Sequence, residues 1–139
     1  MRTPKKRYIL DGRGFSTLEE FYDEVSRVLI PGESWGRNLD AFNDILRGGF
    51  GTPGEGFILE WRYLAVSRQR LGCPETIRQL EQRLLECHPD NRCHVVEELE
   101  LARKGKGPTV LDWLVEIIGE HREGGSQRGD VELDLREGA

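Results

Sequence analysis

The sequence has no hydrophobic run long enough to cross a membrane, and its first residues, MRTPKK, lack the apolar segment of a signal peptide. We therefore expect a cytoplasmic protein that makes no membrane contact. There are only three cysteines, Cys73, Cys87 and Cys93, and an odd number implies no complete disulfide framework. Basic residues are outnumbered by acidic ones, with 20 Lys and Arg against 25 Asp and Glu, which gives a net charge of −5. This balance disfavours nucleic acid as a direct partner and favours a basic protein.

What the chain does contain is typical of a globular protein with a real core: 139 residues, of which 37% are hydrophobic and 32% charged. We find no internal repeat and no second domain boundary, and so expect a single domain over residues 1–139. Short apolar runs bounded by turn residues predict strands at 7–10, 57–61 and 131–135. The middle run is apolar enough for a central strand that is buried on both sides.

Apolar residues at helical spacing fill the segments between these strands. The predicted helices span about 18–29, 38–47, 62–71, 75–86, 92–103 and 110–121. Ser16 with Glu19, and Thr109 with Asp112, are spaced as capping boxes. Strands that alternate with helices imply parallel pairing through right-handed crossovers. We therefore expect a two-layer α/β fold, with a three-stranded parallel sheet in the order 1-2-3 packed by helices.

The helix that is predicted from Asn38 has two different faces. Asp40 and Asp44 share one side, and the opposite side is apolar, with Leu39, Phe42, Ile45 and Leu46. Two carboxylates one turn apart repel by a few tenths of a kcal/mol. They form either a solvated face, with Arg37 and Arg47 as local partners, or a surface on which another molecule docks. Spacing alone favours the solvated face.

Three segments of the chain carry a resemblance to a known family: WGRNLDAFND at 35–44, FILEWR at 57–62 and VLDWLVE at 110–116. They resemble the barstar family, the inhibitors of the secreted ribonuclease barnase. The resemblance covers roughly residues 5–71 and 108–136. It implies three parallel strands in sequence order packed by helices, and it makes 72–107 a helical insertion.

The resemblance also implies a function: inhibition of a basic, barnase-like ribonuclease or a related nuclease toxin, whose active site is blocked by an acidic helix face. Such an active site binds a polyanion and is lined by basic residues, with which carboxylates form charge-assisted pairs. By position, the implied partner-binding residues are Trp35, Asn38, Asp40, Asp44, Glu116 and Glu120. Trp35 is either an aromatic anchor or a core residue, and Asn38 caps its helix with a secondary chance of partner contact.

The sequence departs from the family in three respects. Ser34 stands where the family has a second aromatic residue, a glycine near Gly49 replaces a tryptophan, and residues 72–107 are additional. These departures leave the expected fold intact and the identity of the partner open. A barstar-like binding module for a partner other than a ribonuclease is therefore the main alternative.

Other functions have less support in the sequence. A hydrolase that uses Asp40 and Asp44 as an acid/base or metal-binding pair is disfavoured, because no histidine or nucleophile lies near them in sequence. We expect no enzyme activity, no catalytic residue and no cofactor. A zinc site at Cys87–His88 and Cys93–His94 lacks the usual Cys-x2-Cys spacing, so ordinary packing is favoured there. The glycine-rich segment 48–56 follows a helix and precedes a strand, which is the reverse of a phosphate loop.

Two further expectations concern packing and assembly. His121 falls on the apolar face of the last predicted helix and is expected in the core or at its rim. Self-association would need the acidic faces to meet the basic clusters at 2–7 and 103–106. We expect a monomer when the protein is free of its partner.

Overall fold

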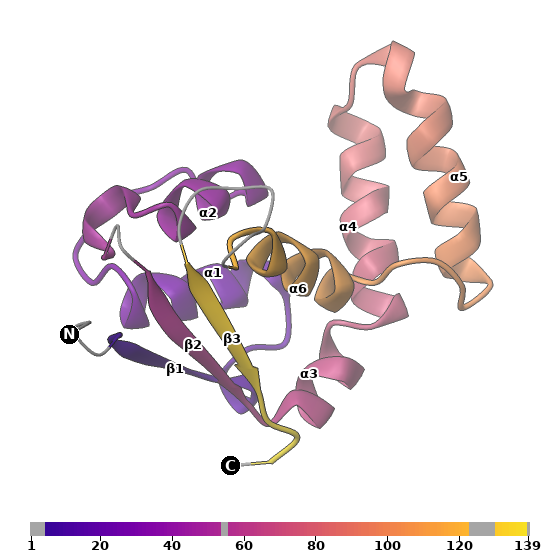
Figure 1. Cartoon of the computed structure of the whole chain (residues 1–139). Helices are drawn as coiled ribbons and strands as arrows, with labels where there is room; N and C mark the ends of the chain where they lie inside the picture. The colour runs from indigo at the N-terminus through magenta and orange to yellow at the C-terminus, as the bar shows by residue number, and fades with distance from the viewer. Residues whose placement is uncertain (1–4, 54–55, 123–129, 139) are drawn as a thin grey trace.

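The computed structural model describes residues 5–53, 56–122 and 130–138 (Figure 1). Its strands β1 (Arg7–Asp11), β2 (Phe57–Arg62) and β3 (Val131–Leu135) form a parallel sheet in the order β1-β2-β3. The register places Leu10 opposite Trp61, and Trp61 opposite Leu135. The three-stranded parallel sheet in sequence order is thus confirmed.

The described residues form six α-helices, at the places where the spacing of apolar residues predicted them. They are α1 (Leu18–Val28), α2 (Leu39–Leu46), α3 (Leu64–Arg70), α4 (Cys73–Glu86), α5 (Arg92–Arg103) and α6 (Val110–Glu120). Short 3-10 turns lie at Gly12–Gly14 (η1), Gly49–Gly51 (η2) and Pro89–Asn91 (η3). α1, α2 and α6 share one core with the sheet, whereas α4 and α5 form a hairpin that projects from it (Figure 1).

The main core lies on the inner face of the sheet, and Trp61 is at its centre. The Trp61 side chain is fully buried and stacks on Phe21, with ring centroids 5.4 Å apart and planes inclined by 18°. Its indole N–H donates a 3.0 Å hydrogen bond to Ser67 Oγ in α3. A tryptophan whose polar atom is satisfied inside the protein can be buried without penalty. Trp61 is thus a core residue.

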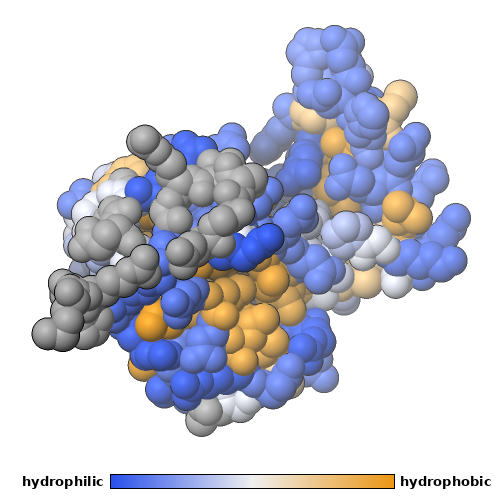
Figure 2. Space-filling view, viewed as in Figure 1, coloured by the Kyte–Doolittle hydropathy of each residue, from blue (hydrophilic) through white to orange (hydrophobic). Residues whose placement is uncertain are grey.

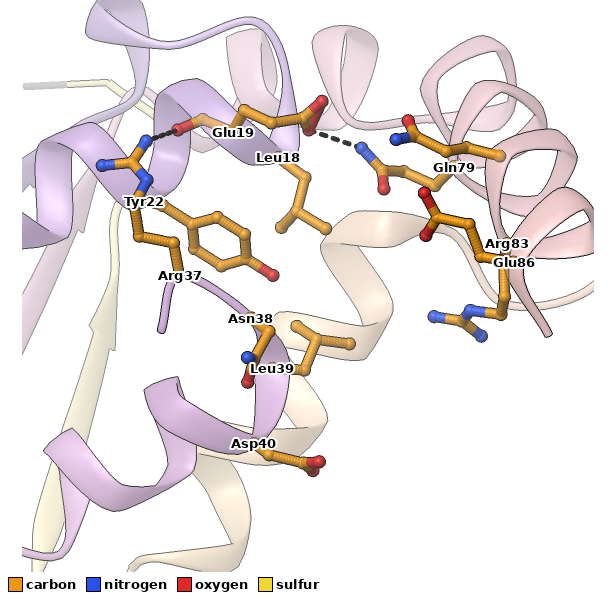
Figure 3. Close-up of a pocket in the computed structure, with 11 residues that line it drawn as sticks. Leu18, Glu19, Tyr22, Arg37, Asn38, Leu39, Asp40, Gln79, Arg83 and Glu86 are labelled. Atoms are coloured by element: carbon orange, nitrogen blue, oxygen red, sulfur yellow. Dashed lines mark hydrogen bonds between the residues drawn. The ribbon is translucent and has the colours of Figure 1, made fainter. Parts of the chain in front are cut away.

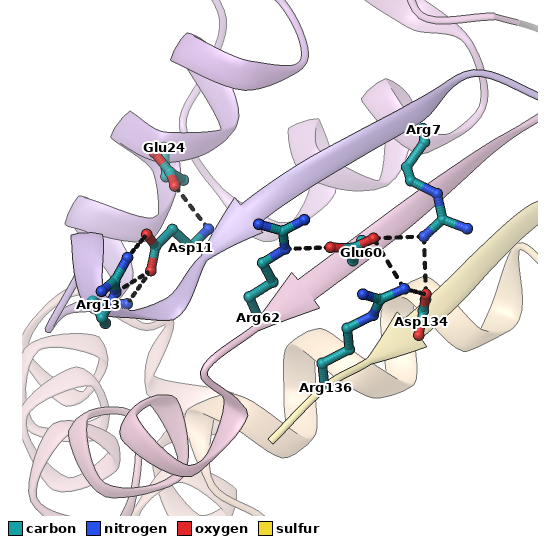
Figure 4. Close-up of polar contacts among 8 residues, drawn as sticks. All are labelled: Arg7, Asp11, Arg13, Glu24, Glu60, Arg62, Asp134 and Arg136. Carbon is teal, nitrogen blue, oxygen red and sulfur yellow. Dashed lines mark hydrogen bonds and ion pairs between the residues drawn. The ribbon is translucent and has the colours of Figure 1, made fainter. Parts of the chain in front are cut away.

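The outer face of β2 is covered by arginines and not by a second layer of helices (Figure 4). Glu60 is only 2% exposed and accepts hydrogen bonds from Arg7 and Arg62, while Arg136 lies 3.3 Å away. Ile9, on the same face of β1, remains 38% exposed. The expectation that the middle strand is buried on both sides is therefore met in part. Side chains bury Glu60 on the outer face, but Ile58 and Arg62 there are only half-buried, because the sheet has helices on one side.

The starts of α1 and α3 differ from the prediction. α1 is capped by Thr17 and not by Ser16: the Thr17 hydroxyl accepts from the Glu20 N–H at 3.1 Å, and the Glu20 carboxylate accepts from the Ser16 N–H at 2.9 Å. α3 starts at Leu64, because β2 continues through Arg62 and the next residue adopts a left-handed conformation. The box of Thr109 with Asp112 at the start of α6 is confirmed.

The α4–α5 hairpin has a small apolar cluster of its own. Its members are Leu80, Leu99 and Ala102, with Ile77, Leu84 and Trp113 packed against them. Trp113 of α6 also packs against the main core and thereby joins the two clusters. α4 begins at Cys73, two residues earlier than expected, with Pro74 in its first turn, where a missing N–H costs nothing.

An apolar area lies on the face of the molecule where β3 and α6 are drawn in Figure 1 (Figure 2). Leu135, at the end of the edge strand β3, is 42% exposed.

No helix in the described part of the chain is long and apolar enough to span a membrane. The same residues hold no group of three His, Cys, Asp or Glu that could bind a metal ion.

Candidate partner-binding surface

The loop before α2 is fixed on α1 by Arg37. Its backbone is left-handed, with φ +52°, and its guanidinium donates to the Glu19 carbonyl at 3.2 Å and to Asp23 Oδ1 at 2.5 Å. The interpretation that Arg37 is the local partner of Asp40 is therefore wrong. The left-handed turn directs the Arg37 side chain back across α1 and away from Asp40.

Trp35 lies against the same helix. Its indole N–H donates to Ser26 Oγ at 2.6 Å, and its ring meets the Tyr22 ring edge to face, with centroids 5.4 Å apart. The side chain is half-buried and packs against the main core. Trp35 thus holds the loop in place, and direct contact with a partner stays a prediction.

α2 begins as the sequence indicates. Asn38 is its N-cap, with Oδ1 accepting from the Ala41 N–H at 2.8 Å. The apolar side of the helix is buried and its first apolar residue, Leu39, is half-buried. Because the cap and the buried face fix the helix, the side chains on its other face start from set positions.

Asp40 and Asp44 occupy that other face, and both are exposed. Asp44 is 59% exposed and lies 3.5 Å from the Arg47 guanidinium, a long and solvated pair. The Asp40 side chain makes no hydrogen bond or ion pair with any other described residue. An exposed pair contributes about 0–1 kcal/mol, so Asp44 stays available to a partner.

The end of α2 is joined to the end of α6 by a buried contact. His121 Nε2 lies 2.5 Å from Asn43 Oδ1, and the His121 side chain is fully buried. The expectation of a core histidine is thus confirmed. Asn43 and His121 are 78 residues apart in sequence, and their contact makes α2 and α6, the two helices that carry the predicted acids, neighbours in space.

α6 contributes two of the predicted residues. Glu116 is exposed and Glu120 is half-buried, one helical turn apart. The side chain of neither forms an ion pair or hydrogen bond with another described residue. Asp112, in the first turn, accepts from the Thr109 N–H at 2.8 Å and is a capping residue, as expected.

A cleft that the sequence did not predict lies between α2 and α4 (Figure 3). Its volume is 490 Å³, and Asn38 and Asp40 form one rim. Tyr22 lies between the two walls, and its burial raises the pKa of the phenol to about 12, so its hydroxyl stays protonated at neutral pH. The cleft depends on how the hairpin docks, which local patterns do not encode.

These features define a class of small α/β protein: a parallel three-stranded sheet packed by helices, of which α2 and α6 are capped and carry acidic residues. The described residues contain no candidate metal centre. The family model described as Barstar (barnase inhibitor) matches residues 6–92, and the chain belongs to the barstar family. The match contains α2 and its loop and ends before α6, so Glu116 and Glu120 lie outside it. The comparison with curated proteins gives no match.

Proposed function

We propose that this protein binds a basic ribonuclease of the barnase type, or a related nuclease toxin, and blocks its active site without any catalysis of its own. The observation that carries this proposal is the fixed presentation of Asp40 and Asp44. Their helix is capped by Asn38 and held at its far end through Asn43 and His121. Membership of a family described as barnase inhibitors supports it.

The physical basis is electrostatic complementarity. A ribonuclease groove must bind phosphates, so it presents Arg, Lys and His, and a carboxylate placed there forms charge-assisted hydrogen bonds. Because Asp40 and Asp44 are already positioned, binding orders few new rotamers. We assign the deepest contact to Asp44, an adjoining one to Asp40, and contacts farther out to Glu116 and Glu120, with Trp35 and Asn38 shaping the approach.

The carboxylate-dependent hydrolase receives no support from this geometry. A catalytic pair needs an accessible base or nucleophile. The nearest histidine to α2 in the hydrogen-bond network, His121, is fully buried and its Nε2 contacts Asn43.

An inhibition assay tests the proposal directly. The purified chain is titrated against a panel of basic microbial ribonucleases that includes barnase, and RNA cleavage is measured. We expect stoichiometric inhibition of at least one enzyme, which is weakened by Asp44→Asn and unchanged by Glu98→Gln, an exposed acid on α5. Absence of both inhibition and complex formation across the panel would refute the proposal.

A further inference from the structure

We propose that the α4–α5 hairpin is a second wall of the partner-binding surface, and that the cleft between α2 and α4 receives an Arg or Lys side chain from a loop of the nuclease. This inference depends on the proposed function and extends it, because it assigns a recognition role to a segment that is not needed to present the acids of α2.

The cleft combines an apolar floor with a charged rim (Figure 3). Leu18 and Leu39 lie on its inner side together with the ring of Tyr22. Asp40 borders it from α2, and Glu86 borders it from α4. A long basic side chain buries its methylene stem on apolar surface and keeps its charged end near carboxylates, which is what this lining offers.

Most other charged groups of the lining already have partners. Glu19 accepts from Arg78 at 2.7 and 2.9 Å and from Gln79 at 2.6 Å, and Arg37 pairs with Asp23. The Arg83 guanidinium lies over the Trp113 ring at 5.1 Å.

Asp40 and Glu86 are different, because the side chain of neither forms an ion pair, a hydrogen bond or a ring contact with any described residue. The five charged side chains of the lining are three carboxylates and two guanidinium groups, a net charge of −1. The groups left to bind a partner are thus both anionic, and they lie on opposite walls. Charge complementarity therefore selects a cation.

The α4 wall of the cleft is anchored to the rest of the protein. Glu75 of α4 accepts from the Leu18 N–H at 2.8 Å, and Thr76 Oγ1 accepts from the Val110 N–H of α6 at 2.9 Å. Glu75 and Thr76 are both buried. Opening the cleft would break buried hydrogen bonds, so the site is organised before the partner arrives.

The test measures the affinity of the full chain for the tightest-binding ribonuclease of the panel. Glu86→Gln removes the charge and keeps the shape, and we expect about a fivefold or larger loss of affinity. Gln82→Trp, at an exposed lining position, fills the cleft and is expected to weaken binding further. Glu98→Gln on α5 is the charge-matched control, and we expect a change of less than twofold.

The outcomes separate the two proposals. If Asp44→Asn weakens binding while Glu86→Gln and Gln82→Trp behave like the control, the hairpin is not part of the surface, although the proposed function stands. If Glu86→Lys tightens binding, the occupant is acidic and the inference is wrong. If Asp44→Asn has no effect, or no ribonuclease binds at all, the proposed function itself fails and the inference fails with it.

Discussion

Glu75, in the projecting hairpin, accepts a 2.8 Å hydrogen bond from the backbone N–H of Leu18, the first residue of α1. The first N–H groups of a helix have no partner within it, and here a carboxylate from another helix supplies one. The same side chain also binds Arg78 at 2.6 Å and Gln79 at 3.0 Å. A buried carboxylate thus couples the hairpin to the helix that supports the α2 loop.

Replacing Glu75 by Ala should destabilise the whole protein. The substitution leaves the Leu18 N–H buried without an acceptor, and loss of such a cap costs about 1–3 kcal/mol. Urea unfolding measures the free energy of unfolding, with Glu81→Ala, an exposed acid on the same helix, as the control. Equal midpoints for the two variants would show that Glu75 does not couple the hairpin to α1.

Acid should weaken the outer face of the sheet. The hydrogen bond from Arg62 lowers the pKa of Glu60 below its ordinary value of 4.5; burial opposes the shift, and Arg7 adds to it. Arg7, followed by Arg136, likewise lowers the pKa of Asp134. A carboxyl whose pKa is lower in the folded state stabilises the fold fully above its unfolded pKa. That stabilisation is lost as the pH falls through the folded value.

Melting temperatures measured in steps from pH 7 to pH 3 check this. The parent protein should lose stability below about pH 4.5. Glu60→Gln should melt lower at pH 7, because three arginines lose a charge partner, and should show a shallower decline in acid. Glu33→Gln, an exposed loop acid, serves as the control. Parallel pH curves for the parent and Glu60→Gln would contradict the assignment.

Gly12 should tolerate no side chain. A Cβ there would lie 2.6 Å from Ser67 Oγ and 2.7 Å from the carbonyl oxygens of Arg62 and Tyr63. Gly12→Ala must displace backbone next to the hydrogen bond that satisfies Trp61, and we expect a loss of about 1–3 kcal/mol. Gly14→Ala is a matched control, because its Cβ would meet only the Glu24 carboxylate at 3.7 Å. Similar unfolding midpoints for both variants would contradict this prediction.

The features that the sequence predicted well are those with local causes. Asn38 caps α2 because a side-chain acceptor reaches an N–H three residues later, and Asp40 and Asp44 share a face because of helical geometry. Short apolar runs bounded by turn residues likewise located the strands. Each of these features is determined by residues within one helix or strand, and therefore the sequence of that segment alone is enough to predict it.

The features that the sequence did not predict depend on tertiary contacts. Arg37 pairs with Asp23, 14 residues away, because a left-handed turn reverses its direction. Glu75 meets Leu18 across 57 residues, and this contact accompanies a helix start one residue later than the Ser16–Glu19 spacing indicated. The cleft beside Asp40 arises only when the hairpin docks. Nothing in the residues near α2 signals its presence.

The acids of the proposed surface should contribute unequally to binding. Asp44 and Asp40 have short side chains on a helix that is fixed at both ends, whereas Glu116 and Glu120 lose more rotamer entropy when they are held. If Asp44 enters the ribonuclease groove, its removal leaves a buried cation of the partner without a counter-charge. Asp44→Ala should therefore cost about 2–5 kcal/mol of binding free energy. Asp40→Ala should be intermediate, and Glu116→Ala or Glu120→Ala should each cost about 1 kcal/mol or less.

Binding isotherms and thermal melts, measured together on these four variants and on Glu98→Ala, distinguish lost contact from lost structure. All five should melt close to the parent, since four of these acids are exposed and the side chain of the half-buried Glu120 has no partner among the described residues. The 3.5 Å pair of Asp44 with Arg47 is the competing structural role. If Asp44→Ala lowers the melting temperature and leaves the affinity unchanged, that local pair is the function of Asp44, and α2 does not enter the partner's active site.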